Sequence, residues 1–351
     1  MFSKDDTNRI KGIAILLLLF HHLFYSASRI ESNGVEFIYI DQNAVQGLAV
    51  LCRVCVWIFL FLSAYGLTYQ FINKKNISIT KFIWQKWISL MLPFVFIYVC
   101  IAVIYSILVD NILLFYDNSI LYLLLDMFGW ADFFGTPMLL GAWWYMCIAQ
   151  ILIFMLPLFV FLCEKLEWTA IPACFILLQF INGGIQSNYG GAYANYLIAA
   201  VSGVLFAQKG ILDSWKKKDH RLVEKVLQNC VILMLILAAL IIKERIKPED
   251  TYYLGGALCA GAVIGISYIY CNCKIRGTCA DILKFLGKHS GNIFMIHAFF
   301  YTYFPITVYW SHNFIVSWLC LILLGILSSY FAEFLKKVIH YNIIIQKFKN
   351  I

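Results

Sequence analysis

Long apolar runs, separated by short basic segments, recur along the whole of this 351-residue chain. A helix needs roughly 20 apolar residues to cross a bilayer, where its backbone polar groups must be satisfied internally. Hydrophobic residues make up 62% of the chain and charged residues only 13%. One soluble core cannot bury this excess, because soluble domains are typically about half apolar and a quarter charged. The sequence therefore predicts an all-α integral membrane protein in which residues 1–351 form a single polytopic bundle.

Ten apolar segments are predicted to cross the membrane. They cover residues 12–28, 45–71, 88–109, 138–163, 169–182, 194–208, 226–242, 251–272, 290–308 and 314–335. The segment 110–137 is not predicted to cross, because aspartates interrupt its apolar runs and carboxylates are costly in lipid. We expect it to be an amphipathic or re-entrant segment on the outer face.

The basic residues lie mainly on one side of this predicted arrangement. If the N-terminus is cytoplasmic, the segments on that side hold 22 of the 27 lysines and arginines. The positive-inside rule then predicts that both termini are cytoplasmic and that the chain is a multi-pass protein of the cytoplasmic membrane. The net charge of +8 is explained by this topology. No basic segment is interleaved with aromatic residues, so membrane lipids are expected partners and nucleic acid is not.

The cysteines do not indicate a metal site. The chain has 12 of them, and most lie inside apolar runs, where cysteine behaves as a small hydrophobic residue. Cys271, Cys273 and Cys279 do cluster, but the spacing C-x-C-x5-C does not match a zinc motif. No metal cofactor is expected.

A few ionisable residues fall inside the predicted spans, where each is a functional hypothesis by default. Eleven residues, three helical turns, separate Lys11 from His22, so the two share a helix face roughly 16 Å apart along the axis. His21 points elsewhere on the helix and cannot do the same job. From its position alone, His22 is either a titratable base or a residue that hydrogen-bonds a neighbouring helix.

Further polar residues extend this set. Arg53, in the second predicted span, needs an anionic partner, carbonyls or water, and it is expected to meet His22 in one cavity. From its position alone, His297 is interpreted first as a residue that hydrogen-bonds a neighbouring helix. Lys81 and Lys86 are either phosphate ligands or topology signals. The consecutive Trp143 and Trp144 are expected in an interfacial aromatic belt.

Five blocks in this order resemble the acyltransferase-3 family of integral-membrane acyltransferases. They are I-K-G-I-A-I-L-L-L-L-F-H-H around Lys11 and His22, V-W-I-F-L-F-L-S-A-Y-G-L at 56–67, K-F-I-W-Q-K-W-I-S-L-M-L-P at 81–93, A-W-W-Y-M at 142–146 and L-G-K-H-S-G-N-I-F-M-I-H at 286–297. The family often has Arg where this chain has Lys11, and a Ser-Gly pair is Ser63-Ala64 here. Arg and Lys differ in how they bind phosphate, so the details of cofactor contact are affected more than the class.

The resemblance implies a membrane enzyme that transfers an acyl group, most often acetyl, from acyl-CoA to a hydroxyl of a cell-surface polysaccharide or lipid-linked glycan. Acetyl-CoA would be the cytoplasmic donor. The implied catalytic residues are His22, as general base or acyl carrier, Arg53, as oxyanion stabiliser, and His297. The implied cofactor-binding residues are Arg9, Lys11, Lys81 and Lys86.

A second hypothesis is a transporter or flippase that exports a glycan or lipid-linked sugar. The short spans joined by the glycine-rich residues 181–192 are typical of such proteins. No clear correspondence between two halves of the chain supports it. In the enzyme hypothesis, the loop 183–193 and the acidic segment 110–137 are expected to contact the acceptor. The oligomeric state is not predicted.

Overall fold

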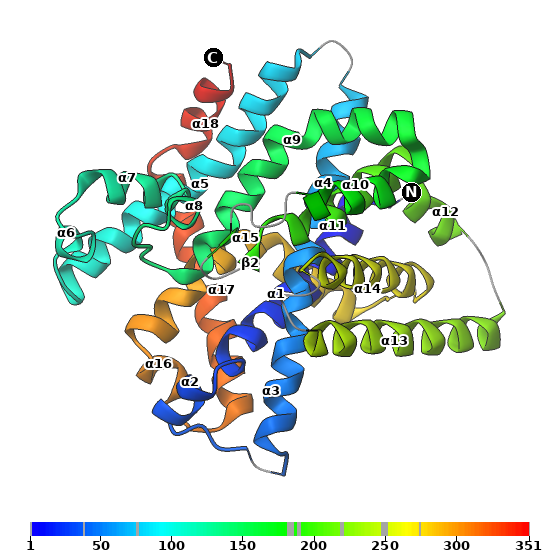
Figure 1. Cartoon of the computed structure of the whole chain (residues 1–351). Coiled ribbons are helices and arrows are strands. Elements are labelled where there is room, and N and C mark those ends of the chain that lie inside the picture. The colour runs from blue at the N-terminus through cyan, green and yellow to red at the C-terminus, as the bar shows by residue number, and fades with distance from the viewer. Residues whose placement is uncertain are drawn as a thin grey trace.

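The computed structural model describes residues 2–37, 39–74, 77–180, 186–187, 191–217, 221–246, 252–273 and 275–350. Nearly all of them are helical (Figure 1). The long helices are α1 (Lys4–Phe24), α4 (Cys55–Asn73), α5 (Ile79–Leu108), α9 (Trp144–Leu166), α11 (Ala194–Lys209), α13 (Leu222–Arg245), α14 (Tyr252–Asn272), α15 (Thr278–Tyr303) and α17 (Phe314–Val338). The predicted all-α polytopic class is confirmed.

Short elements connect these helices. They are α2 (Ala27–Ser32), α3 (Gln42–Leu51), the 3-10 turn η1 (Cys52–Val54), α6 (Ile112–Phe115), α7 (Ile120–Met127), α8 (Ala131–Phe134), η2 (Gly141–Trp143), η3 (Glu167–Thr169), α10 (Ala170–Phe180), α12 (Ile211–Lys217), α16 (Ile306–Tyr309), α18 (Tyr341–Asn350) and the two-residue strands β1 (Gln186–Ser187) and β2 (Gly191–Ala192). The strands pair antiparallel.

Six helical segments in the described part of the chain are long and apolar enough to cross a membrane. They are Gln42–Asn73, Ile79–Leu108, Gly141–Leu177, Leu222–Arg245, Leu254–Asn272 and Phe314–Val338. The bent pair α11 and α12, with 63° between its two parts, is a seventh if it counts as one span. α1 and α15 are long enough, but the lysines and histidines that they carry make them more polar. The count of ten spans and the cytoplasmic termini therefore stay predictions.

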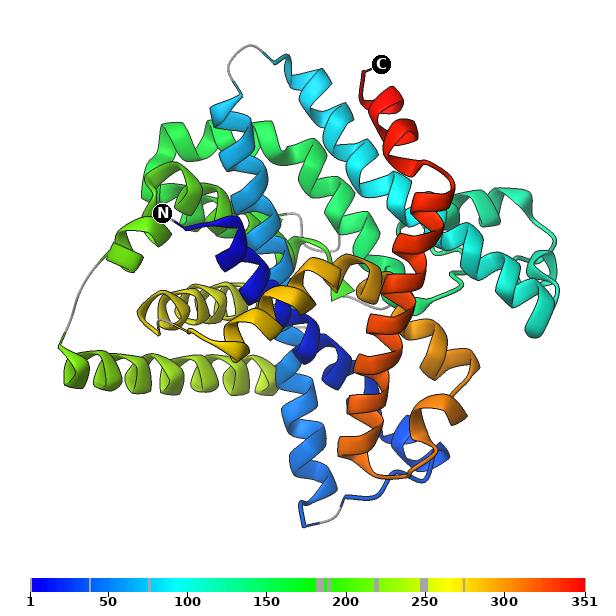
Figure 2. The same cartoon turned by 180° about the vertical axis from the view of Figure 1, so that it is seen from behind.

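The backbones of α1 and α15 touch, and both views show the two helices crossing near the centre of the bundle (Figures 1 and 2). A Cβ on Gly12 would overlap the carbonyl of Leu283, and a Cβ on Gly287 would overlap the carbonyl of Asn8. Small residues allow this close approach, which is how helices associate strongly in a membrane. The glycines of the first and last sequence blocks are therefore packing residues.

One end of the bundle holds both chain termini and is called the lysine-rich end below. Phe2 packs on Tyr65 of α4, and the indole of Trp84, at the start of α5, donates a 2.8 Å hydrogen bond to the carbonyl of Phe348. Lys284 and Asp5 form an ion pair of 2.6 Å between α15 and α1. The helices α2 and α16 lie at the opposite end, called the outer end.

Asp6 fastens the start of α1 at the lysine-rich end. It closes a capping box with Ser3, is 1% exposed, and accepts hydrogen bonds from Lys216 at 2.6 Å and Tyr270 at 2.8 Å. Burial raises the pKa of this carboxyl, but the bonds from Lys216 and Ser3 outweigh it and lower the pKa to about 2. Asp6 therefore stays ionised in the folded protein and links α1 to α12 and α14.

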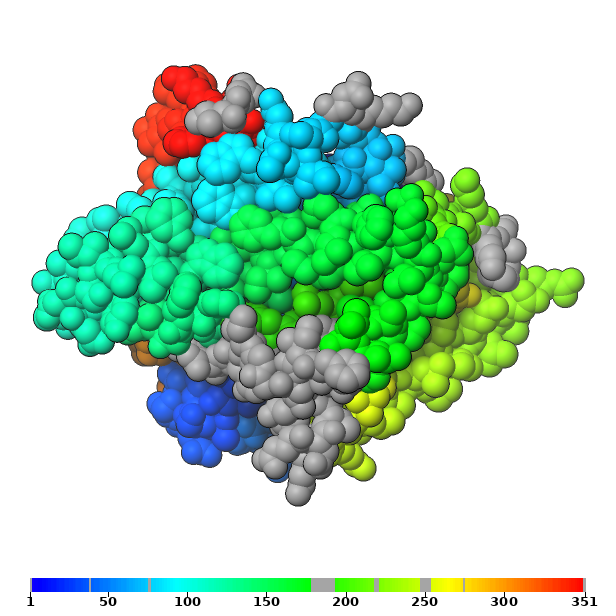
Figure 3. Space-filling view, turned by 45° about the horizontal axis from the view of Figure 1, so that its top comes forward, coloured from blue at the N-terminus to red at the C-terminus, as the bar shows by residue number. Residues whose placement is uncertain are grey.

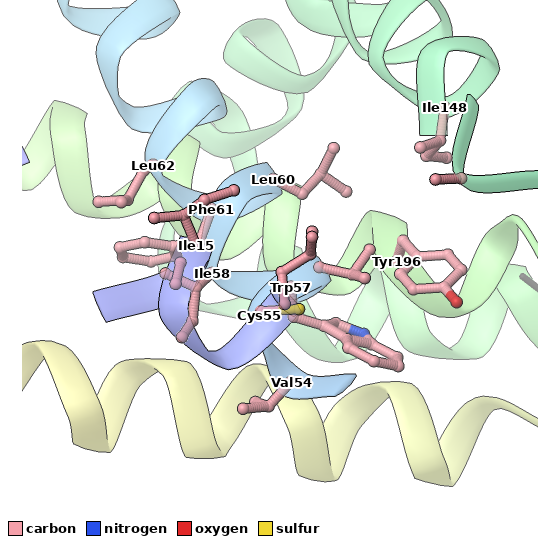
Figure 4. Packing of buried hydrophobic residues seen from close by; sticks show 14 of the residues in the cluster. Ile15, Val54, Cys55, Trp57, Ile58, Leu60, Phe61, Leu62, Ile148 and Tyr196 are labelled. Carbon is pink, nitrogen blue, oxygen red and sulfur yellow. The ribbon is translucent and has the colours of Figure 1, made fainter. Parts of the chain in front are cut away.

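The packing of α4 against α11 and α9 supports the outer end of the site. Figure 4 shows Trp57 beside Tyr196, and the ring centroid of Trp144, in α9, lies 5.2 Å from that of Tyr196. The rings of Trp57 and Tyr196 lie 4.6 Å apart, and the Trp57 indole donates to the carbonyl of Asn195 at 3.1 Å. A Cβ on Gly203 would overlap the carbonyl of Phe61, so these helices also meet through a small residue.

The segment 110–137 folds into the short helices α6, α7 and α8, none of which could span a bilayer. They form a lobe beside α9 at the edge of the molecule (Figure 3). Two of the segment's aspartates are buried and hydrogen-bonded within the protein. Asp126 accepts from Tyr116 at 2.5 Å and from the Leu139 amide at 2.8 Å, and Asp132 accepts from Tyr193. They fix the lobe because buried carboxylates need such donors.

The contact between α1 and α15 gives a first prediction. Gly287→Ala inserts a methyl group against the Asn8 carbonyl, so the two helices must move apart. We expect the free energy of unfolding to fall by about 1–3 kcal/mol, which is measured as a lower unfolding midpoint in detergent. Gly261→Ala in α14 is the control, because no atom lies within 4 Å of the added Cβ. There we expect no loss, since Ala favours helices. Equal effects at both sites would contradict the close contact.

Asp126 gives a second prediction, on pH. Burial raises its pKa to about 7 from 3.8, although bonds from Leu139 and Tyr116 act in the opposite direction. The folded state therefore binds the proton more tightly than the unfolded chain does. The resulting stabilisation is complete below about pH 4 and is lost as the pH rises toward 7. It amounts to several kcal/mol, since a tenfold change in proton affinity corresponds to about 1.4 kcal/mol.

The test compares thermal unfolding midpoints at pH 5 and pH 8 for the wild type and for Asp126→Asn. The wild-type midpoint should fall between these pH values, and the variant, which cannot ionise there, should fall less. Asp117→Asn, at an exposed position of the same segment, should behave like the wild type. Parallel pH profiles for all three proteins would exclude Asp126 as the titrating group.

Candidate active site at the junction of two cavities

Two cavities meet at His22. The inner cavity, about 550 Å³, opens at the lysine-rich end between α1, α4, α5, α9 and α15. The outer cavity, about 450 Å³, lies toward the outer end and is lined by α1, α2, η1, η2 and α15. His22, Val56, Ala142 and Trp144 line both of them. His22 therefore borders both the cavity toward the lysine-rich end and the cavity toward the outer end.

The ring of His22 is surrounded by other rings. Its centroid lies 5.0 Å from that of His297 and 6.0 Å from that of Tyr301, with which it is nearly parallel. Among the described residues, no group hydrogen-bonds its ring nitrogens, while its backbone carbonyl accepts from Arg29. Both ring nitrogens are thus available for a substrate, so the alternative that His22 only ties helices together is not supported by its contacts.

His297 is fully buried beside it. Its Nδ1 lies 2.8 Å from the carbonyl of Phe294 and 3.2 Å from that of Ile293. A carbonyl can only accept, so Nδ1 carries a proton, and the Nε2 of the neutral ring is then an acceptor. Nε2 is buried and has no hydrogen-bond partner in the described structure. The helix of His297 therefore orients its ring, and the lone pair of Nε2 remains free to accept a hydrogen bond near His22.

His21 differs from His22, as its direction on the helix predicted. Its Nδ1 lies 2.7 Å from the carbonyl of Ala49 in α3, so this ring joins α1 to α3. It lines only the outer cavity.

Arg53 lies in the 3-10 turn η1, where the long apolar segment of α3 and α4 is broken. Such a turn within a helical run is typical of functional positions. One Nη of Arg53 donates to the hydroxyl of Tyr196 at 3.3 Å, and the side chain lines the outer cavity together with His22. The structure thus brings the two residues to one cavity, as expected from the sequence.

The cationic residues of the inner cavity are only partly those expected. Lys11 lines it, accompanied by Lys4 and Lys288, which the sequence pattern did not single out. Lys86 lies one turn beyond Leu90, a lining residue, and its ammonium bonds Gln70. Lys81 is exposed and lines neither cavity.

Arg9 lies beside a different cavity, of about 460 Å³, near Asp6 and Tyr270. Its guanidinium is 3.7 Å from the Asp6 carboxylate. Arg9 and Lys11 therefore lie on different faces of α1. Side chains two positions apart on a helix point about 200° away from each other.

The expected aromatic belt at Trp143 and Trp144 is wrong. Both are buried, with exposed fractions of 1% and 7%. Trp143 packs between α5 and α15 and donates to the carbonyl of Met295 at 2.9 Å, while Trp144 separates the two cavities. A buried indole needs such an acceptor, and here the chain supplies one within the bundle.

Arg29 is a functional candidate that the sequence pattern did not indicate, because its position predicts an outer loop. It lies in α2, bonds the His22 carbonyl and lines the outer cavity. No pattern in the sequence indicates this contact, because α1 ends at Phe24 and a turn separates it from α2. The other acceptor-contact candidate, 183–193, falls largely outside the described residues, which omit 183–185 and 188–190.

One comparison with known proteins identifies the family of the chain. No curated protein and no solved structure matches the chain. The sequence profile of a family described as "Acyltransferase domain" matches residues 6–334, nearly the whole chain, including His22, Arg53 and His297. The protein therefore belongs to the acyltransferase-3 family and is a multi-pass membrane acyltransferase.

Proposed function

We propose that this acyltransferase takes an acyl group, most simply acetyl, from acyl-CoA at the lysine-rich end and transfers it to a hydroxyl of a cell-surface polysaccharide or lipid-linked glycan at the outer end. The observation that carries the proposal is the access to His22 from two cavities. A donor in the inner cavity and an acceptor in the outer one would meet at a single imidazole. The family favours this function over the transporter or flippase alternative.

The inner cavity has the charges that an acyl-CoA needs. Lys4, Lys11 and Lys288 provide ammonium groups for the coenzyme's phosphates. Lys11 lies roughly 16 Å along the axis of α1 from His22. The extended pantetheine arm of coenzyme A has a comparable length, so phosphates bound near Lys11 would bring the thioester to His22. In this proposal the lysine-rich end faces the cytoplasm, which supplies acyl-CoA, and the protein lies in the cell membrane.

Two balanced routes are available to His22. As a general base, it takes the proton of the acceptor hydroxyl while the oxygen attacks the thioester carbonyl; the C–S bond breaks and the proton passes to the leaving CoA thiolate. As a nucleophile, its ring nitrogen attacks the thioester carbonyl, the C–S bond breaks, and the proton of the imidazole N–H passes to the CoA thiolate, which leaves an acyl-imidazole. The acceptor oxygen then attacks the acyl carbon, the C–N bond breaks, and the hydroxyl proton returns to the imidazole. In either route negative charge develops on the acyl oxygen, and Arg53 supplies a permanent positive charge in the outer cavity.

His297 acts in this proposal as a positioning residue. Its Nδ1–H is committed to the Phe294 carbonyl, so only Nε2 can interact with a neighbour. The ring centroids of the two histidines are 5.0 Å apart, and a small rotation would let Nε2 accept a hydrogen bond from His22. That bond would leave the second nitrogen of His22 unprotonated and facing a substrate, the arrangement by which a partner orients a catalytic base.

The first test uses purified protein in nanodiscs with acetyl-CoA labelled in its acetyl group. His22→Ala should lower CoA release at least about 100-fold, the usual contribution of a positioned acid–base residue. His340→Asn is the control, because His340 is exposed and its positive φ of 52° suits Asn. Label retained on the wild-type protein would identify the acyl-imidazole route, and label found only on added glycan would identify the general-base route.

Other outcomes would contradict the proposal. Equal turnover by wild type and His22→Ala would leave the family intact but remove His22 from the reaction. If the wild type neither binds nor turns over any acyl-CoA with glycans present, the proposed donor is wrong.

The second test concerns the donor. Lys11→Gln and Lys288→Gln should each raise the KM for acetyl-CoA about tenfold with a smaller effect on kcat, because a charge-assisted bond to phosphate is lost. Acetyl-pantetheine lacks the phosphates, so its KM should not change. Lys165→Gln is the control, since this exposed lysine at the end of α9 lines neither cavity. An equal rise of KM for both donors would exclude phosphate binding by these lysines.

A further inference from the structure

The charge of the outer cavity is one-sided. Arg29 and Arg53 line it with His21 and His22, and in the part of the chain that the structure describes no aspartate or glutamate lines it. The remaining polar lining consists largely of aromatic hydroxyls, among them those of Tyr25, Tyr301 and Tyr303. Guanidinium groups do not lose their proton in proteins, so the cavity is permanently cationic.

Arg29 is held in place by contacts that do not neutralise it. Its Nη1 donates to the carbonyl of His22, and its guanidinium carbon lies 4.5 Å from the ring centroid of Tyr301 and 5.5 Å from that of Tyr25. These contacts orient the planar group. A guanidinium has five N–H donors, and the carbonyl of His22 is the one acceptor that the described structure offers this side chain.

Arg53 has a different environment. It donates to the hydroxyl of Tyr196, and its positive charge interacts with the negative charge of Glu244. In the proposed reaction, Arg53 stabilises the negative charge that develops on the acyl oxygen. Arg29 has no role in the proposed reaction so far. Its guanidinium lies over the ring of Tyr301, and the ring of Tyr301 is stacked on that of His22.

A neutral sugar would fit this cavity poorly for a physical reason. It would displace water from the guanidinium of Arg29 without supplying a counter-charge, and uncompensated desolvation of a charge is costly. An anionic group on the acceptor would supply that charge and fill two of the free N–H donors in a planar, bidentate bond. The aromatic rings beside it offer faces on which the sugar itself can lie.

We propose that the acceptor of this enzyme carries a negative charge, a carboxylate or a phosphate, close to the hydroxyl that is acylated, and that Arg29 binds this group. The inference rests on the proposed function, whose acceptor it narrows from glycans in general to anionic glycans. Arg29 is accordingly a specificity-determining residue. It discriminates through binding, before any acyl group moves.

Binding of three matched sugars to the full-length protein in nanodiscs tests this. The probes are methyl β-glucoside, which is neutral, methyl β-glucuronide, which carries a carboxylate, and glucose 6-phosphate. Ligand-observed NMR titrations without donor measure their affinities. We expect at least one anionic sugar to bind the wild type about tenfold or more tightly than the neutral one, the effect of one charge-assisted bidentate bond. A preference for the carboxylate or for the phosphate identifies the source of the charge.

Variants then assign the preference to Arg29. Arg29→Gln should reduce it to less than about twofold, and Arg29→Lys should retain part of it, because Lys keeps the charge but not the bidentate geometry. Arg245→Gln removes an exposed arginine at the end of α13 that lines neither cavity, and it should keep the full preference. Unfolding midpoints show whether Arg29→Gln is folded, and the Lys variant carries the test if it is not.

Two results would overturn the inference. One is equal binding of the three sugars by the wild type, including no detectable binding of any of them. The other is an equal loss of affinity for all three in Arg29→Gln, which would mean that Arg29 only shapes the cavity. Because binding is measured without acyl-CoA, a protein that prefers anionic sugars but releases no CoA would contradict the proposed function and leave this inference standing.

Discussion

The contact between the backbones of α1 and α15 determines the geometry of both cavities. Gly12 and Gly287 allow these helices to cross without intervening side chains. Each glycine is followed ten residues later by a histidine, roughly 15 Å along its helix, and both helices run from the lysine-rich end to the outer end. His22 and His297 therefore reach the same level and face each other, while Lys11 and Lys288 reach the mouth of the inner cavity.

Much of this arrangement follows from the sequence, because it depends on local rules. Apolar runs identify the long helices, aspartates exclude 110–137 as a span, and helical periodicity sets Lys11 and His22 on one face. Arg53 needed one further assumption, that adjacent antiparallel helices share a cavity. The ordered blocks of the family indicate the class of reaction, because a motif is a local pattern of residue types and spacings.

The sequence could not predict contacts that depend on tertiary packing. Arg29 looks like an outer-loop residue until the turn after α1 folds it back over Tyr301. The tryptophan pair looks interfacial until α15 supplies an acceptor for the indole of Trp143. Asp126 looks solvated until the amide of Leu139 and the hydroxyl of Tyr116 reach it. In each case the deciding partner is distant in the sequence or lies across a turn whose direction no periodicity reports.

The path of the chain into α9 adds a contribution that no side chain makes. Leu140 is extended, η2 begins at Gly141, and the first residues of this helical run line the outer cavity and its junction with the inner one. The peptide dipoles of a helix sum to a partial positive charge at its first turn. The junction is therefore electropositive through main-chain amides alone. Substituting side chains around His22 would change the selectivity and rate of this centre. The electric field of the main-chain amides, which favours negative charge, would remain as long as the backbone conformation is unchanged.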